Sequence, residues 1–287
     1  NFEGGLIMKE VNTAEIVKAV KKMCINSNIH LNEDVKNKIK EASNNEKWPM
    51  AKGILNKILD NVDTAAAENM PMCQDTGMAC VFVELGQDVH IVGGSIEDAI
   101  NEGVRQGYEE GYLRKSVVKD PLNRVNTKDN TPAVIYYDVV PGEKLKITVA
   151  PKGFGSENMS QIKMLKPADG LEGVKNFILK VVKEAGPNPC PPIVVGVGIG
   201  GTFDKAANLA KRALIRPLSE RNHNKFYASL EEELLKKINE TGIGPQGFGG
   251  LTTALAVNIE TYATHIAGLP VAVNINCHVT RHDEVEF

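Results

Sequence analysis

The chain has 287 residues, of which 42% are hydrophobic and 24% are charged, and its formal net charge is −3. This composition is typical of a soluble globular protein that is long enough to bury a sizeable core. The weakly acidic balance gives no reason to expect nucleic acid or an anionic membrane surface as a partner. No apolar run approaches the roughly 20 residues of a membrane span.

The first seven residues, Asn-Phe-Glu-Gly-Gly-Leu-Ile, do not resemble a signal peptide, because no basic region precedes an apolar one. We expect Met8 to be the natural initiator, residues 1–7 to be an expression remnant, and the protein to be cytoplasmic. Residues 8–287 are expected to form one compact domain.

The first part of the chain predicts helices and then a strand. Apolar residues recur at helical spacing in three segments, and a loop over 69–77 precedes a run rich in valine. The expected helices are 12–26, 31–42 and 51–67, and the expected strand is 79–85.

The middle of the chain mixes both periodicities. Ser95 and Asp98 resemble a capping box at the start of a helix that reaches about Leu113. Two strand-like runs, 133–140 and 144–150, flank Pro141-Gly142, and this spacing predicts a β-hairpin.

The last part of the chain alternates helical and strand-like segments. We expect helices at 171–185, 205–215 and 230–239, a strand at 193–199, a glycine-rich stretch at 242–250, and apolar segments at 251–259 and 271–275. The sequence therefore predicts an α/β protein with a helical N-terminal part, followed by mixed sheets with packed helices.

Five cysteines are present, an odd number that argues against a disulfide framework. Cys24 lies in a helical period and Cys80 begins a strand, so both are expected to be buried structural residues. Cys73, Cys190 and Cys277 instead lie in turn-rich, proline-rich or polar segments. Their long spacing matches no short zinc or ferredoxin pattern, and on spacing alone three unrelated thiols are the commoner explanation. Their shared loop context favours metal binding.

Six segments together, in order along nearly the whole chain from residue 8, resemble the class I fumarases and their tartrate dehydratase relatives. They are Pro71-Met-Cys-Gln-Asp-Thr-Gly77, Leu113-Arg-Lys-Ser-Val-Val118, Asn126-Thr-Lys-Asp-Asn-Thr-Pro132, Lys152-Gly-Phe-Gly-Ser-Glu-Asn158, Gly198-Ile-Gly-Gly-Thr-Phe-Asp-Lys205 and Asn276-Cys-His-Val279.

The resemblance implies a [4Fe–4S] cluster held by the thiolates of Cys73, Cys190 and Cys277. With three protein ligands, one iron keeps an open position and can act as a Lewis acid toward a substrate oxygen. The same openness is expected to make the cluster sensitive to oxygen.

The resemblance also implies roles for the residues beside the first thiol. Asp75 and Gln74 could be ordinary turn residues, because Asp-Thr-Gly is good turn chemistry. The matching family residues belong to the catalytic set and contact substrate, respectively. His265 lies between apolar segments, where a lone histidine is more often a satisfied core residue. The family match favours a catalytic Asp75–His265 pair instead.

Two further residues are expected to bind substrate. Arg114 could be a solvated helix-terminal residue, but the resemblance implies a bidentate carboxylate clamp. Gly155 matches a glycine whose backbone meets substrate. Many relatives have three consecutive glycines here, whereas this chain has Phe154 in the middle, which leaves the loop shape and the substrate open.

The remaining glycine-rich and basic segments are interpreted as structural or surface features instead of ligand-binding sites. The stretch 196–201 fits neither a Walker sequence nor Gly-x-Gly-x-x-Gly, so nucleotide binding is disfavoured. His278, Arg281 and His282 are interpreted as polar surface or interface residues rather than ligands.

The resemblance implies that residues 8–287 are the α-subunit (N-terminal catalytic) domain of an iron–sulfur hydro-lyase. A separate β subunit is expected to complete the site for a small dicarboxylate and to supply the base, in an α2β2 assembly. The expected reaction is the reversible hydration of fumarate to (S)-malate. The alternatives are L(+)-tartrate dehydration to oxaloacetate, a non-catalytic metal-binding scaffold subunit, and a structural protein without metal.

Overall fold

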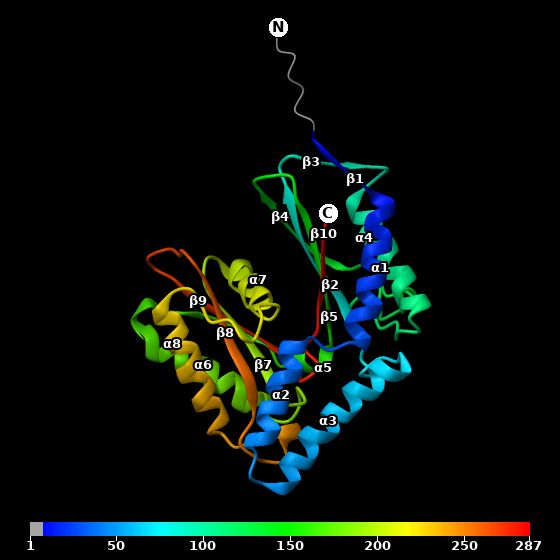
Figure 1. The fold of residues 1–287 in the computed structure, drawn as a ribbon. Coiled ribbons are helices and arrows are strands. Elements are labelled where there is room, and N and C mark those ends of the chain that lie inside the picture. Colours follow the sequence, from blue (N-terminus) through cyan, green and yellow to red (C-terminus); the bar gives the residue numbers. More distant parts are fainter. Residues whose placement is uncertain (1–7) are drawn as a thin grey trace. The chain divides into compact units, whose positions relative to one another are not determined.

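The computed structural model describes residues 8–287, and the expected expression remnant at residues 1–7 lies outside the described residues (Figure 1). The chain divides into two compact units. Unit 1 comprises residues up to His30, Asn69–Lys152 and Arg281–Phe287, and unit 2 comprises Leu31–Glu68 and Gly153–Thr280. Both contain helices packed with strands, which confirms the predicted α/β class.

Unit 1 is built on a four-stranded sheet whose order is β10-β5-β2-β4. Helices α1 (Thr13–Ile29) and α4 (Ile96–Glu110) share an apolar core with this sheet. A short parallel pair, β1 (Lys9–Asn12) with β3 (Val89–Val92), completes the unit. The sheet strands are β2 (Met78–Gly86), β4 (Val134–Val140), β5 (Leu145–Lys152) and β10 (Asp283–Glu286).

The predicted hairpin between β4 and β5 is wrong. Strand β2 lies between them, parallel to β4 and antiparallel to β5. The Pro141–Gly142 connection therefore crosses the end of β2: the amide of Gly86 donates to the carbonyl of Lys144 at 2.9 Å, and that of Asp88 donates to Gly142 at 3.0 Å. The local turn signal was correct, but the pairing is decided by a strand from far earlier in the chain.

Unit 2 contains a second four-stranded sheet, in the order β6-β9-β7-β8. The central strand β7 is buried at every position, and it runs parallel to β8 and antiparallel to β9. The strands are β6 (Gln161–Leu165), β7 (Ile193–Gly200), β8 (Ala254–Tyr262) and β9 (Leu269–Asn276). The helices are α2 (Glu33–Asn45), α3 (Pro49–Glu68), α5 (Phe154–Glu157), α6 (Gly170–Ala185), α7 (Phe203–Ala213) and α8 (Lys225–Asn239).

The glycines of β7 serve helix packing. A Cβ at Gly196 would lie 2.2 Å from the carbonyl oxygen of Ala210, and one at Gly198 would lie 2.0 Å from that of Ala206, both in α7. The alternate valines of β7 belong instead to the core shared with α6 and α8. The two faces of the strand are therefore occupied by different helices, and the glycine-rich stretch is explained without a nucleotide.

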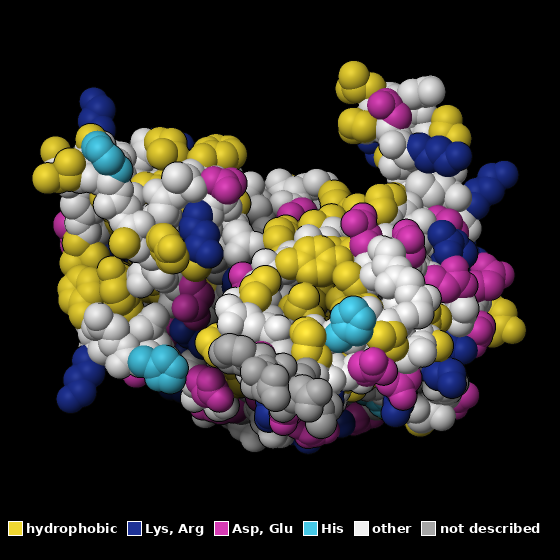
Figure 2. Space-filling view, turned by 90° about the horizontal axis from the view of Figure 1, so that it is seen from above, with side chains coloured by type: hydrophobic (Ala, Val, Ile, Leu, Met, Phe, Trp, Pro, Cys, Tyr) yellow, Lys and Arg dark blue, Asp and Glu magenta, His cyan; other side chains and the backbone are white. Residues whose placement is uncertain are grey.

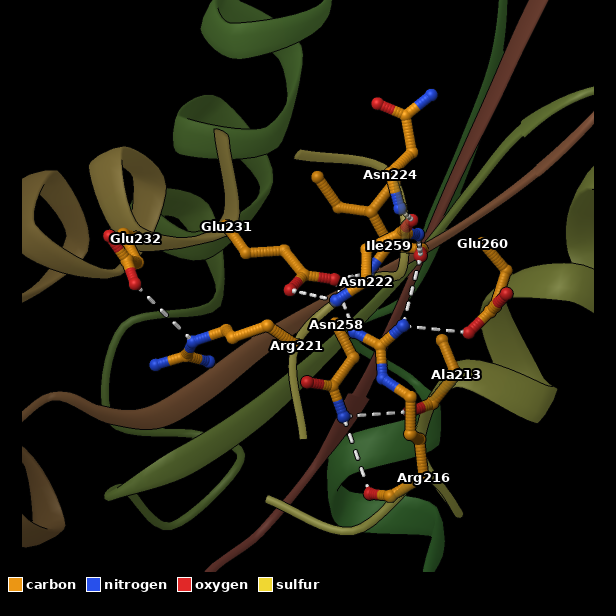
Figure 3. Close-up of polar contacts among 10 residues, drawn as sticks. All are labelled: Ala213, Arg216, Arg221, Asn222, Asn224, Glu231, Glu232, Asn258, Ile259 and Glu260. Atoms are coloured by element: carbon orange, nitrogen blue, oxygen red, sulfur yellow. Dashed lines mark hydrogen bonds and ion pairs between the residues drawn. The ribbon is translucent and has the colours of Figure 1, made fainter. Parts of the chain in front are cut away.

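A buried polar network ties α8 and β8 to the segment after α7 (Figure 3). The carboxylate of Glu231, which has no exposed area, pairs with Arg216 and accepts the amide of Ile259 at 2.8 Å. Arg216 also pairs with Glu260 at 2.9 Å. The amide group of Asn258 donates to the carbonyl of Ala213 at 3.0 Å.

Within residues 8–287, no helix combines the length and the apolar character needed to cross a membrane. On the face seen in Figure 2, the Lys, Arg, Asp and Glu side chains of the described residues are interspersed. This mixture agrees with a formal net charge of only −3.

Candidate functional site

The segment that carries Cys73, Gln74 and Asp75 lies in unit 1, immediately before β2. Cys73 is half-buried, and its Sγ accepts the amide N–H of Asp75 at 3.4 Å. Asp75 Oδ1 accepts the amide of Gly77 at 3.0 Å, which is the local geometry of an Asx turn. Asp75 therefore forms the turn that its sequence context predicts, and the same turn directs the Asp75 N–H toward the Cys73 thiol.

Two buried side chains fix the backbone after Cys73. The hydroxyl of Tyr108 donates to the carbonyl oxygens of Thr76 at 2.7 Å and Gly77 at 3.1 Å. Burial raises the pKa of Tyr108 well above its ordinary value, so the phenol remains a donor. Arg281 Nη2 donates to the carbonyl of Asp75 at 2.6 Å.

Arg281 was not expected in this role. Sequence reasoning interpreted it as a polar surface or interface residue, yet it is only 5% exposed. The interpretation is wrong because the guanidinium lies under the Asp75 turn, 206 residues earlier in the chain. No short motif records such a contact.

Arg114 is brought to the same segment through its backbone. Thr76 Oγ1 donates to the carbonyl of Arg114 at 3.1 Å, while the guanidinium side is exposed. Gln74 is exposed as well. Unit 1 therefore gathers four of the predicted site residues around one turn, and the residues Gln74 and Arg114 among them are exposed.

The Asn126–Pro132 motif supports this turn from the other side. The fully buried amide of Asn130 donates to the carbonyl of Gly77 at 3.1 Å and accepts the N–H of Ser116 at 2.7 Å. One side chain thus joins the Cys73 segment to the segment after Arg114. The motif has a structural task that sequence reasoning did not assign.

The other two thiols lie in unit 2, on segments that touch each other. Cys190 is exposed with φ of +55°, and Cys277 follows β9 directly and is half-buried. The carbonyl of Cys190 lies 2.9 Å from His278 Nδ1 and 3.4 Å from the backbone N of His278. The residue next to one thiol therefore contacts the backbone of the other.

Gly155 lies in the short helix α5 beside the same proline-rich segment. A Cβ at this position would come no closer than 3.9 Å to the carbonyl of Asn188, and the residue is exposed. Among the described residues, no neighbouring atom beyond the adjacent residues therefore requires glycine here. Helix α5 is anchored by Glu157, which pairs with Lys211 at 2.7 Å and accepts from Asn274 at 2.7 Å.

His265 lies on the exposed connection between β8 and β9, and its Nδ1 accepts the amide of Ala267 at 3.1 Å. The commoner interpretation of a satisfied core histidine is therefore wrong. Asp75 belongs to unit 1 and His265 to unit 2. Their pairing stays a prediction.

The donor chemistry of the cysteines fits an iron–sulfur cluster. Those predicted as ligands are exposed or half-buried, whereas Cys24 and Cys80 are buried, as predicted. The amide donated to Cys73 Sγ is a hydrogen bond of the kind that tunes such clusters. Among residues 8–287, no group of three or more Cys, His, Asp or Glu side chains is placed to hold a metal ion.

Comparison with known proteins assigns the family. The model of the family described as fumarate hydratase (fumerase) matches residues 17–286. A protein of Methanocaldococcus jannaschii named "Putative L(+)-tartrate dehydratase subunit alpha" is 47% identical over 261 residues, covering 88% of this chain and 90% of the relative. The L(+)-tartrate dehydratase subunit alpha of Escherichia coli K12 is 31% identical over 283 residues, covering 96% and 93%. The chain belongs to the class I fumarate hydratase family, which is known for iron–sulfur-dependent hydro-lyases.

Proposed function

We propose that this chain is the α subunit of a [4Fe–4S]-dependent hydro-lyase that dehydrates L(+)-tartrate to oxaloacetate. The observation that carries the substrate is the 47% identity to a relative with that name, over nearly the full length of both chains. Sequence analysis placed fumarate hydration first, and the description of the matching family model keeps it as the second candidate. Both reactions add or remove water on a four-carbon dicarboxylate.

The proposed cluster ligands are Cys73, Cys190 and Cys277. When bound, a cluster with three thiolate ligands supplies an iron with an open position that serves as a Lewis acid. The case for these thiols is their position in this chain: they lie outside the helices and strands and are exposed or half-buried, unlike the buried Cys24 and Cys80.

The proposed roles of the other residues follow from their chemistry. Arg114 binds a substrate carboxylate through its planar guanidinium, and Gln74 donates to a carboxylate or hydroxyl oxygen. Gly155 leaves room for the substrate to approach the backbone. Asp75 and His265 hold a proton and deliver it to the substrate hydroxyl oxygen, so that this group leaves as water when its C–O bond breaks.

A β subunit is proposed to complete the site. The relatives are named as alpha subunits, and the reaction also needs a base for the C–H proton, which none of the proposed residues supplies. We propose that the partner contributes this base and further cationic contacts to the second carboxylate, in an α2β2 heteromer. The α chain alone is then expected to bind a cluster and to show little activity.

Anaerobic reconstitution of the chain with iron and sulfide tests the cluster. We expect about four irons per chain and the absorption of a cubane cluster. Cys73→Ala, Cys190→Ala and Cys277→Ala should each lose most of this iron, whereas Cys24→Ala and Cys80→Ala should keep it. Full iron content in the first three variants would overturn the ligand set.

Steady-state kinetics of the α chain with its β partner tests the substrate. A kcat/KM for L(+)-tartrate at least about tenfold above that for fumarate or malate supports the proposal, because a site that hydrogen-bonds the second hydroxyl discriminates against substrates that lack it. The reverse order would establish the fumarate candidate. No turnover of any of the three would reject both.

A further inference from the structure

The glycine-rich stretch 242–250 has no task in the proposed function, yet it touches the segment that carries Cys190. The amide N of Gln246 donates to the carbonyl of Pro191 at 2.7 Å, and its side-chain Nε2 donates to the same oxygen at 2.8 Å. One residue thus satisfies both acceptor directions of the carbonyl that follows the thiol.

His278 binds the preceding carbonyl. Its Nδ1 lies 2.9 Å from the carbonyl oxygen of Cys190, and an oxygen of this kind can only accept. The imidazole therefore carries its proton on Nδ1 and donates it to Cys190. His278 Nδ1 is also 3.2 Å from Gln246 Nε2, so the two side chains form one cluster over consecutive carbonyls.

The Cys190 segment depends on outside donors. In Gly186-Pro-Asn-Pro-Cys-Pro-Pro192, four of seven residues lack an N–H, so the segment has few hydrogen bonds of its own to offer. Cys190 also holds φ of +55°, which a non-glycine residue keeps only where its surroundings impose it. The thiol direction is therefore set by neighbouring segments.

The supporting stretch is itself firmly anchored. Gly247 has φ of +79°, and a Cβ there would lie 2.3 Å from Cβ of Pro187, so the two segments are in close contact. The amide of Gly244 donates to Thr253 Oγ1 at 3.0 Å, and the amide of Leu251 donates to the buried Glu46 carboxylate at 2.7 Å.

Gln246 and His278 line a cavity of about 500 Å³ together with residues of α3, including Met50, Ile54 and Asn61. Part of each side chain therefore faces open space, while its hydrogen bond to the Pro191 or Cys190 carbonyl fixes its polar end.

We infer that Gln246 and His278 are positioning residues that fix Cys190 relative to Cys277, so that both thiolates are arranged before the cluster binds. This inference rests on the proposed function. Groups that orient metal ligands in this way typically change metal affinity by about 10- to 100-fold when they are removed.

The test compares variants that differ in one hydrogen bond. Gln246→Glu keeps the shape but replaces the side-chain donor with an acceptor facing a carbonyl, and His278→Ala removes the imidazole. His278→Asn places an amide donor near the position of Nδ1, so it should restore the hydrogen bond to the Cys190 carbonyl that His278→Ala removes. Asn258→Ala, which breaks a fully buried contact elsewhere in unit 2, is the control for general destabilisation.

The first measurement is the rate of iron loss to a chelator after anaerobic reconstitution, with paramagnetic resonance of the reduced cluster. Gln246→Glu and His278→Ala should lose iron at least about tenfold faster than the wild type and show altered spectra. His278→Asn and Asn258→Ala should stay within about threefold. Equal loss rates in all five proteins would overturn the inference.

The second measurement uses the chain without metal, so that it separates this inference from the proposed function. The alkylation rates of Cys190 and Cys73 are followed by peptide mass spectrometry. In Gln246→Glu and His278→Ala, the Cys190 rate should change several-fold while the Cys73 rate stays constant. Unchanged Cys190 rates would reject the positioning role. A wild type that takes up no cluster, with altered Cys190 rates in these variants, would reject the proposed function alone.

Discussion

Arg281 is a buried cation of unit 1 whose role sequence analysis did not identify. Its guanidinium donates to the carbonyl of Asp75, so truncation leaves a partly buried acceptor without this donor. We predict that Arg281→Ala lowers the free energy of unfolding by about 2–3 kcal/mol, as for hydrogen bonds from charged donors. Urea unfolding of the chain without metal measures this loss of free energy.

The matched control is Arg124→Ala, because Arg124 is exposed and, among residues 8–287, donates only to the nearby carbonyl of Pro121. Its effect should stay within about 0.5 kcal/mol. Arg281→Lys should fall between the wild type and Arg281→Ala, since an ammonium keeps the charge but not the planar fork. Equal stabilities of Arg281→Ala and Arg124→Ala would contradict the assigned contact.

Cys24 provides a second prediction at the scale of single residues. Complete burial raises the pKa of its thiol from 9.0 to about 12. A rise of three units leaves about a thousandth of the ordinary thiolate at pH 8, and the thiolate is the nucleophile. We therefore predict that iodoacetamide modifies Cys24 at least about 100-fold more slowly than the exposed Cys190.

Peptide mass spectrometry of a time course measures both rates in one sample. In urea the two cysteines should react at similar rates, which is the control for intrinsic differences. Fast native alkylation of Cys24 would show that helix α1 opens readily at this position.

The residue scale shows what a sequence can and cannot predict about this site. Context and resemblance identified the accessible thiols and the Asp75 turn. They missed Arg281, Tyr108, Gln246 and His278, because each acts through a backbone carbonyl that lies far away in sequence. Carbonyl acceptors carry no residue signature, so such contacts become visible only with coordinates.

At the scale of elements, the segment between α4 and β4 contains Asp129, a carboxylate whose pKa is lowered. Burial raises the pKa of Asp129, but hydrogen bonds from Thr131 and Arg105 outweigh it, and the pKa falls from 3.8 to about 2. The stabilisation from this carboxylate is present above the unfolded pKa near 4 and is lost as the pH falls toward 2. Its size is about 2 kcal/mol at neutral pH.

We predict that Asp129→Asn is less stable than the wild type by up to that amount at pH 7, and that the gap closes between about pH 4 and pH 2. Urea unfolding of both proteins across pH 2 to 7 measures the gap. A gap that does not change with pH would assign the loss to altered packing instead of to the charge.

The buried pair of Arg216 and Glu231 joins α8 to the segment after α7 (Figure 3). Glu231 has no exposed area and also accepts the amides of Ile259 and Asn222. Removing one partner of a buried pair strands the other charge, which costs about 3–5 kcal/mol. We predict a loss of this size for Glu231→Ala in denaturant unfolding.

The neighbouring Glu232 is the control, because its 3.9 Å pair with Arg221 is largely exposed on the carboxylate side. Glu232→Ala should cost less than about 1 kcal/mol. The double variant Arg216→Met with Glu231→Leu should recover part of the loss, since it leaves no unpaired buried charge. A loss in Glu231→Ala no larger than that of Glu232→Ala would show that the pair is not buried in solution.

Helices and strands with strong hydrophobic periodicity were predicted well, whereas the pairing of strands in the sheets was not. The expected helix at 51–67 is α3, and the expected strand at 79–85 is β2. The short strands β1, β3, β6 and β10 were missed, because four or five residues with mixed polarity carry little pattern. The hairpin failed because local turn chemistry cannot show that β2 takes the place between β4 and β5.

At the scale of the whole molecule, the chain passes between the two compact units four times. The four-stranded sheet of unit 1 takes its strands from the middle of the chain and from the last residues, and unit 2 includes α2 and α3 from the early part. Sequence analysis proposed one domain over 8–287, since no linker composition marks these passages. Composition reveals boundaries only where a chain leaves a unit through exposed polar residues.

The C-terminal segment, residues 281–287, allows the division of the chain into two units to be tested. Strand β10 pairs with β5, Asn26 donates to Asp283 at 2.8 Å, and Val285 and Phe287 pack against the core of unit 1. Deleting the segment also removes Arg281 and leaves β5 as an edge strand, which favours association. We predict that the protein shortened after Thr280 loses hydrogen-exchange protection in β2, β5 and α1.

Peptides of β7 and α8 in unit 2 should keep their protection, because their core contains no residue of the deleted segment. Hydrogen exchange followed by mass spectrometry reads both units in one sample. The variant Arg281→Ala, with β10 retained, separates the loss of one contact from the loss of the strand. Two units with separate stabilities can open one at a time. Equal loss of protection in both units would therefore mean that they unfold together, as one cooperative unit.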